Sequence, residues 1–127
     1  MIVVDASAAL SALLNAGPAR NILASEQLHA PHLIDPEVAS GLRRGVAAKW
    51  LDAGAGWTAL DAWRRLGITR YPVVAMLDRV WELRDNLSAY DASYVALAEL
   101  LGCNLLTADA RLSRAPGTDC PITVVPR

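Results

Sequence analysis

The chain has 127 residues, with 12 basic and 13 acidic side chains and a formal net charge of −1. This length suits one domain, residues 1–127, and an apolar fraction of 54% argues against intrinsic disorder. The near-neutral charge excludes a globally basic nucleic-acid binder but not a local basic patch. No apolar run exceeds five residues, and the N-terminal residues lack the basic region of a secretory signal. We therefore expect a cytoplasmic protein with no membrane partner.

The first third of the chain is predicted to alternate between strands and helices. Residues 2–4 form an apolar run that ends at an acid, which is typical of a buried strand. Ser7 is the predicted cap of the following helix, and residues 15–18 separate that helix from a second short one. Residues 28–30 form the next candidate strand. Asp35 is then expected to cap a helix with a proline in its first turn.

The middle of the chain is less regular. Gly54 and Gly56 are expected to interrupt the stretch that follows the third helix. Apolar residues at helical spacing predict a helix over residues 60–66, and residues 68–72 form a possible strand. A further helix is predicted over residues 73–87.

The last third has clearer boundary signals. Ser88 and Asp91 have the S-x-x-D form of a capping box, and Gly102 is a good helix stop. Residues 104–107 and 122–125 read as strands. Strands that alternate with helices predict an α/β domain, with a mostly parallel sheet of about four or five strands flanked by helices.

Four acids lie where a parallel sheet binds its ligands, outside the carboxyl ends of the strands. Asp5 closes the first strand, Glu37 and Asp91 lie in first turns of helices, and Asp109 follows the strand that ends at Thr107. Gathered carboxylates repel one another, and a hard divalent cation with oxygen ligands, such as Mg²⁺ or Mn²⁺, removes that cost. Such an ion can activate water and neutralise charge on a phosphodiester oxygen.

Each acid also has a structural interpretation. Asp5 could cap the first helix, and the negative charge of Glu37 could simply interact favourably with the positive end of a helix dipole. Asp91 could be half of a capping box, and Asp109 an ordinary turn residue. Spacing alone leaves both interpretations open. The chain has no nucleotide-binding glycine loop, and its two histidines and two cysteines lack metal-ligand spacing. We therefore expect two buried, reduced thiols.

The basic residues are unevenly placed. Eight of the twelve lie between Arg43 and Arg84, and eleven of the twelve are arginines, whose guanidinium groups suit phosphate. The candidates for contacts with nucleic-acid phosphates are Arg43, Arg44, Arg64, Arg65 and Arg70. A plain solvated face is an equally good interpretation of these residues. The four tryptophans lie in the same region. Most are expected in the core, although a surface with Trp50, Leu51, Trp57 and Leu60 would offer apolar anchors to a partner.

Four segments resemble motifs of the PIN-domain ribonucleases. The first is Ile2–Ala8, and the second is Pro36-Glu37-Val38 with Leu42. The third and most specific is Ala89–Ala98, and the fourth is Leu105–Asp109 with Leu112. They follow one another in the order and spacing of that family over nearly the whole chain. The compact single-domain form is similar to VapC toxins of bacterial type II toxin–antitoxin pairs.

This resemblance implies a PIN fold, an Mg²⁺- or Mn²⁺-dependent endoribonuclease, a homodimer and a cognate VapB-type antitoxin. The matched motifs carry the catalytic acids Asp5, Glu37, Asp91 and Asp109. Asp5 and Asp91 would be the principal metal ligands, with Asp109 as a third, and Glu37 and Asp109 would complete the acidic pocket, directly or through water. Ser7 and Thr107 would be supporting hydroxyls.

One position departs from the pattern. Some members carry a further acid or Asn just after the fourth acid, whereas this chain has Ala110 and Arg111. Arg111 would contact phosphate or lie in solvent. The predicted reaction is RNA cleavage by metal-activated water that leaves a 5′-phosphate and a 3′-hydroxyl. The alternatives are a non-catalytic RNA-binding PIN domain and a protein-interaction module whose acids cap helices.

Overall fold

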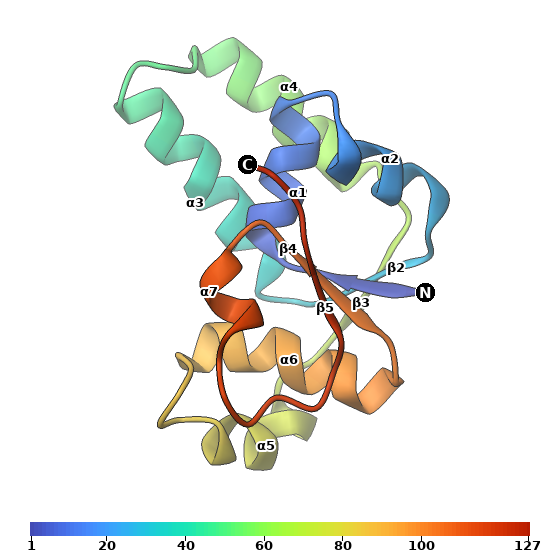
Figure 1. Cartoon of the computed structure of the whole chain (residues 1–127). Helices are drawn as coiled ribbons and strands as arrows, with labels where there is room; N and C mark the ends of the chain where they lie inside the picture. The colour runs from blue at the N-terminus through green and yellow to red at the C-terminus, as the bar shows by residue number, and fades with distance from the viewer.

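A computed structural model describes residues 1–127 and contains one five-stranded sheet (Figure 1). The strand order is β3-β2-β1-β4-β5, and every neighbouring pair is parallel. The strands are β1 (Ile2–Val4), β2 (Leu28–Pro31), β3 (Ile68–Tyr71), β4 (Asn104–Thr107) and β5 (Ile122–Val124). All five were expected from the sequence, and the predicted α/β class is confirmed.

Helices cover both faces of this sheet. They are α1 (Ala6–Leu14), α2 (Pro18–Ser25), α3 (Ile34–Ala47), α4 (Ala53–Arg64), the 3₁₀ turn η1 (Val74–Met76), α5 (Leu77–Glu82), α6 (Ala89–Leu101) and α7 (Ala110–Ser113). Figure 1 shows α1 to α4 on one side of the sheet and α5 and α6 on the other, with the α3–α4 hairpin projecting outward. None of the helices is long and apolar enough to cross a membrane.

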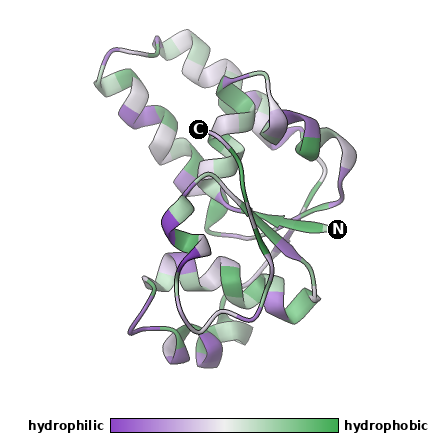
Figure 2. Ribbon diagram, viewed as in Figure 1, coloured by the Kyte–Doolittle hydropathy of each residue, from purple (hydrophilic) through white to green (hydrophobic).

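The core is centred on β1, the middle strand of the sheet. Val3 and Val4 are fully buried between the helical layers, next to Leu105 and Leu106 of β4. A strand that is buried on both faces needs a continuous apolar run, which explains why Ile-Val-Val is not interrupted by polar residues. Figure 2 shows the same distribution, with mostly hydrophobic central strands and hydrophilic residues spread over the outer helices.

Capping explains where the third sequence motif begins. The Ser88 hydroxyl accepts a hydrogen bond from the Asp91 amide at 3.1 Å. Ser88 therefore caps α6, as the sequence predicted. Gly102 ends this helix in the left-handed conformation, with a φ of 65°, as glycine permits. These two boundaries place Asp91 in the first turn of α6, at the edge of the sheet where the strands end.

Two predicted caps were wrong. Asp5, not Ser7, caps α1, because the Asp5 carboxylate accepts the Ala8 amide at 2.9 Å. Asp35 caps nothing: α3 begins at Ile34, and the Asp35 carboxylate instead binds a guanidinium and an indole from other elements. Asp5 was the alternative cap that the sequence offered, whereas the partners of Asp35 lie 28 and 35 residues away, where a local pattern does not reveal them.

Three further differences concern helix lengths. Gly54 and Gly56 lie inside α4, which begins at residue 53 because Asp52 caps it. A Cβ on Gly56 would lie 3.3 Å from Val46, so this glycine allows α3 and α4 to approach closely. The helix predicted over residues 73–87 is only η1 followed by α5, and α7 was not predicted.

Candidate active site

Asp5 is the anchor of the acidic site. It follows β1 and is nearly fully buried. Its Oδ1 accepts hydrogen bonds from the Ser7 hydroxyl at 2.7 Å and from the Ala8 amide at 2.9 Å, and its Oδ2 accepts one from the Thr107 hydroxyl at 2.5 Å. Burial raises the pKa of Asp5, although these three donors act in the opposite direction. Both carboxylate oxygens are therefore fixed in direction.

Ser7 and Thr107, the two predicted supporting hydroxyls, connect the first and fourth motifs. The Ser7 hydroxyl also accepts the Ala108 amide at 2.8 Å, and the Thr107 hydroxyl accepts the Asp109 amide at 3.0 Å. The turn after β4 is thus hydrogen-bonded to the turn after β1. This arrangement sets where Asp109 lies relative to Asp5.

Glu37 has a partner that the sequence analysis missed. The buried Tyr94 hydroxyl donates a 2.5 Å hydrogen bond to Glu37 Oε1. Burial raises the pKa of Glu37, and the charges of Asp91 and Asp5 raise it further, while the Tyr94 bond lowers it. A signal was present in the sequence, since Tyr94 lies three residues after Asp91 and so shares its face of α6.

Asp109 is held by an arginine from its own turn. The Arg111 guanidinium donates to both carboxylate oxygens, from Nε to Oδ1 at 3.1 Å and from Nη2 to Oδ2 at 2.9 Å. This pair lowers the pKa of Asp109. Asp91 has a raised pKa, first because it is buried and then because the charge of Asp109 is close.

The structure brings the four predicted acids into one electrostatic cluster. The charge of Asp91 raises the pKa values of Asp5 and Glu37, and the charge of Asp109 raises that of Asp91. No three of them stand close enough in this arrangement to hold one metal ion. Tyr94 holds Glu37, and Arg111 holds Asp109. The donors are carboxylates and hydroxyls without histidine or thiolate, a set that fits Mg²⁺ or Mn²⁺.

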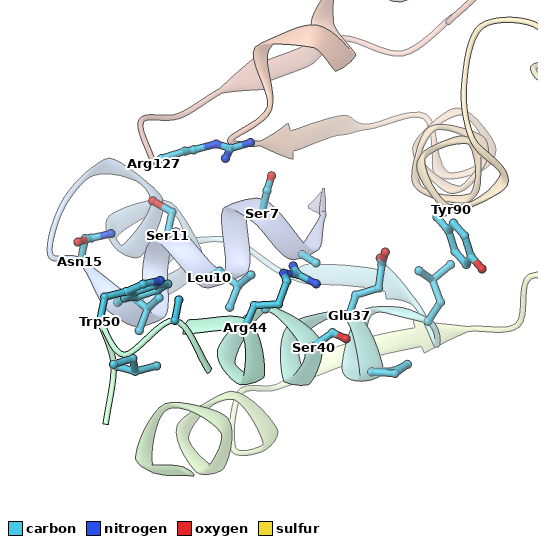
Figure 3. A pocket seen from close by; sticks show the side chains of 17 residues that line it. Ser7, Leu10, Ser11, Asn15, Glu37, Ser40, Arg44, Trp50, Tyr90 and Arg127 are labelled. Carbon is cyan, nitrogen blue, oxygen red and sulfur yellow. The ribbon is translucent and has the colours of Figure 1, made fainter. Parts of the chain in front are cut away.

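A large cleft opens beside this cluster (Figure 3). It has a volume of about 1150 Å³ and runs between α1 and α3, from Ser7 and Glu37 to Trp50. Figure 3 shows Glu37 and Arg44 projecting from α3 into this space, with Arg127 approaching from the C-terminal segment. The cleft is open and elongated, so it suits a polymer or a peptide segment better than a small enclosed ligand.

The five candidate RNA-binding arginines do not form one surface. Arg64 and Arg65 both pair with Asp61, at 2.7 and 2.9 Å. Arg70 forms a two-pronged pair with Asp35, at 2.7 and 2.9 Å. Of the five, only Arg44 lines the cleft next to an acid of the cluster. Arg43 lies over a second, shallower groove between α3 and α4.

The expectation that most tryptophans lie in the core was wrong. Only Trp63 is buried, whereas Trp50, Trp57 and Trp81 are 62%, 58% and 68% exposed. The reason is the projecting α3–α4 hairpin, which has no second layer to cover Trp57. Trp50 lies over Gly45, where an added Cβ would come within 2.8 Å of the indole. Both cysteines are free thiols, but they are only partly buried rather than in the core.

Comparison with known proteins identifies the family. The PIN domain model matches residues 2–117, and the chain therefore belongs to the PIN-domain family. Over 127 residues it is 65% identical to the VapC ribonuclease Mb0985 of Mycobacterium bovis, and the alignment covers both chains completely. Within the PIN family, the chain thus belongs to the VapC ribonucleases.

Solved structures agree on the fold. The structure of PAE2754 from Pyrobaculum aerophilum superposes with a TM-score of 0.72 and 26% identity, covering 95% of this chain and 81% of that one. VapBC2 of Rickettsia felis, solved with a DNA fragment from its promoter, superposes with a TM-score of 0.71 and 13% identity, covering 97% and 98%. The second likeness bears on the fold alone.

Removing the Tyr94 hydroxyl tests the hydrogen bond to the Glu37 carboxylate. Tyr94→Phe keeps the ring in the core and should lower the free energy of unfolding by about 1–3 kcal/mol, because a half-buried carboxylate loses a donor. Urea unfolding measures this loss. In a Glu37→Gln background the same change should cost less, because the charged acceptor is gone. An equal cost in both backgrounds would show that the Tyr94 contact with the carboxylate contributes no stability.

The raised pKa values of the acidic cluster predict how the stability of the protein depends on pH. A buried carboxyl with a raised pKa stabilises the fold while protonated, and this contribution is lost as pH rises from the unfolded pKa through the folded pKa. Without divalent cations, Asp91→Asn should therefore be more stable than wild type at neutral pH, and the difference should vanish in acid. Unfolding in EDTA across that pH range measures it. A less stable Asp91→Asn protein at neutral pH would contradict the electrostatic cluster.

Proposed function

We propose that this VapC ribonuclease is an Mg²⁺- or Mn²⁺-dependent endoribonuclease toxin that cuts RNA with a metal-activated water. The observation that carries the proposal is the clustering of four carboxylates, from four separate motifs, at the carboxyl edge of a parallel sheet. Their mutual repulsion lowers the stability of the metal-free protein. The same repulsion favours the binding of a cation, which a metal-dependent enzyme needs. The products would be a 5′-phosphate and a 3′-hydroxyl.

Asp5 and Asp91 would be the principal metal ligands, with Asp109 as a third, direct or through water. The bound ion would supply an activated water and neutralise charge on a phosphodiester oxygen. Ser7 and Thr107 hold the Asp5 oxygens in fixed directions. Tyr94 occupies Glu37 Oε1, which leaves Oε2 to orient the water or accept its proton.

The interaction-module alternative explains part of the site. Asp5 does cap α1, and Asp109 does cap α7. A cap, however, needs no charge, because Asn or Ser caps a helix equally well and costs less to bury. Asp5 is nearly fully buried beside other acids, and Glu37 and Asp91 cap nothing. A metal-binding role accounts for these features, and a capping role does not.

Conservative removal of two ligands tests the nuclease. Asp5→Asn and Asp91→Asn should each lower the rate of RNA cleavage with Mg²⁺ or Mn²⁺ by about two orders of magnitude or more. Asp52→Asn is the matched control, because Asp52 also caps a helix but lies outside the site. Its cleavage rate should equal that of wild type. Cleavage by Asp91→Asn protein at the wild-type rate, with contaminating nuclease excluded, would refute the proposal.

The partner we propose is a VapB-type antitoxin that lies in the cleft. The cleft joins the acidic cluster to the exposed Trp50, so it offers a site for an inserted basic side chain and an apolar anchor together. A homodimer and a cytoplasmic location, both expected from the sequence and its resemblance, stay predictions.

Substitution of two exposed tryptophans tests whether Trp50 is an apolar anchor for the antitoxin. Trp50→Ala should speed dissociation of a VapB-type protein encoded by the adjacent gene, because it removes apolar contact area. Trp81→Ala, which changes an equally exposed indole on α5, should not. Cleavage by both variants should stay near the wild-type rate. Equal dissociation rates for the two variants would place the antitoxin elsewhere.

A further inference from the structure

Arg111 is the arginine in direct contact with the acidic cluster. Its guanidinium spans both oxygens of Asp109, and its side chain is 82% exposed. Its positive charge also favours the ionised form of Asp91 and so opposes the rise in the pKa of that acid. Arg111 thus lies between the cluster and solvent, close to two of the proposed metal ligands.

Two other ion pairs show what a structural arginine does in this fold. Arg79 binds Glu99 and also donates to the Gly117 carbonyl at 2.7 Å, which fastens the loop before β5 to α5 and α6. Arg70 binds Asp35 and so joins β3 to α3. Each of these pairs connects segments that are at least 20 residues apart.

The Arg111–Asp109 pair does not connect distant segments of the chain. Its members are two residues apart on one turn, and the guanidinium makes no other hydrogen bond. An exposed pair like this contributes little stability, because solvent screens it and side-chain entropy opposes it. The fold therefore does not depend on the pair, and the guanidinium is free to leave Asp109 when a stronger partner arrives.

The same pair blocks Asp109 as a metal ligand. Oδ1 accepts both the Arg111 amide and its Nε, and Oδ2 accepts Nη2. A divalent cation that reaches Asp109 must therefore displace the guanidinium, and it also repels it. Two other arginines face the cluster, Arg44 beside Glu37 and Arg127 beside Asp109, but neither forms an ion pair with an acid.

We propose that Arg111 is an exchangeable counter-ion, which neutralises Asp109 in the metal-free protein and binds an RNA phosphate once a divalent cation has replaced it. The proposal rests on the proposed function, since it assumes the metal site. A guanidinium suits this role because it binds carboxylate and phosphate with the same pair of parallel donors. Its place on the short α7, at the rim of the cluster, would put it beside the backbone of a bound RNA.

The exchange predicts opposite effects on two ligands. Arg111→Gln should bind Mn²⁺ alone several-fold more tightly than wild type in calorimetric titration, because the competing cation is gone. It should bind a mixed-sequence single-stranded RNA oligonucleotide several-fold more weakly in Ca²⁺, with the RNA checked to be intact. The log–log salt slope of that RNA binding should flatten by about 0.7, the value for one phosphate contact on a single strand.

Arg114→Gln is the matched control. Arg114 lies on the same turn, is exposed and forms no ion pair, so its loss should leave Mn²⁺ affinity unchanged. In EDTA, where Arg111 stays on Asp109, Arg111→Gln should lose its effect on the RNA salt slope. Thermal melting checks that both variants fold.

Both the Mn²⁺ titration and the RNA salt slope can contradict the proposed role of Arg111. Equal or weaker Mn²⁺ binding by Arg111→Gln would overturn the counter-ion role, and an unchanged salt slope in Ca²⁺ would overturn the phosphate contact. These results would leave the nuclease proposal standing if wild-type protein still binds Mn²⁺ and cuts RNA. Wild-type protein that binds no Mn²⁺ would instead refute the metal site, and with it both proposals.

Discussion

The buried carboxylate of Asp5 is the interaction on which the rest of the site depends. It ends the central strand, caps α1 and accepts the Thr107 hydroxyl from the neighbouring strand β4. Three donors fix the directions of its oxygens and oppose the rise in the pKa of Asp5 that burial causes. The first and fourth motifs, about a hundred residues apart, meet through this one group.

The other acids raise the electrostatic cost of that arrangement. Glu37 and Asp91 approach Asp5 from opposite layers of the fold, on α3 and α6, and each has a raised pKa. The protein offsets this cost locally, through the Tyr94 hydroxyl and the Arg111 guanidinium, and a divalent cation would offset it more fully. On the proposed function, an RNA substrate would bring further negative charge, which a cation and nearby arginines together would offset.

Much of the fold could be predicted from the sequence because local signals agreed with tertiary structure. The apolar run before Asp5, the Ser88 cap and the Gly102 stop all placed their elements correctly. The four acids were predicted from their places at strand ends and helix starts, the resemblance added their roles, and the structure brings them into one electrostatic cluster. Their roles as ligands stay a prediction, because no metal-holding group of three forms in this arrangement.

The missed features depend on contacts that local patterns do not encode. Asp35 looked like a cap, but its partners are Trp63 and Arg70, 28 and 35 residues away. Gly56 looked like a helix breaker, but it serves close packing against Val46. Trp57 is exposed because it lies on the projecting α3–α4 hairpin, whereas the exposed Trp81 lies on the separate helix α5.

The most direct test of this account is a crystal structure of the protein with Mn²⁺, with anomalous scattering used to locate the ion. An anomalous peak is expected within coordination distance of carboxylate oxygens of both Asp5 and Asp91. An ordered Mn²⁺ that touches neither residue, or a cluster that stays without metal at a saturating Mn²⁺ concentration, would contradict it.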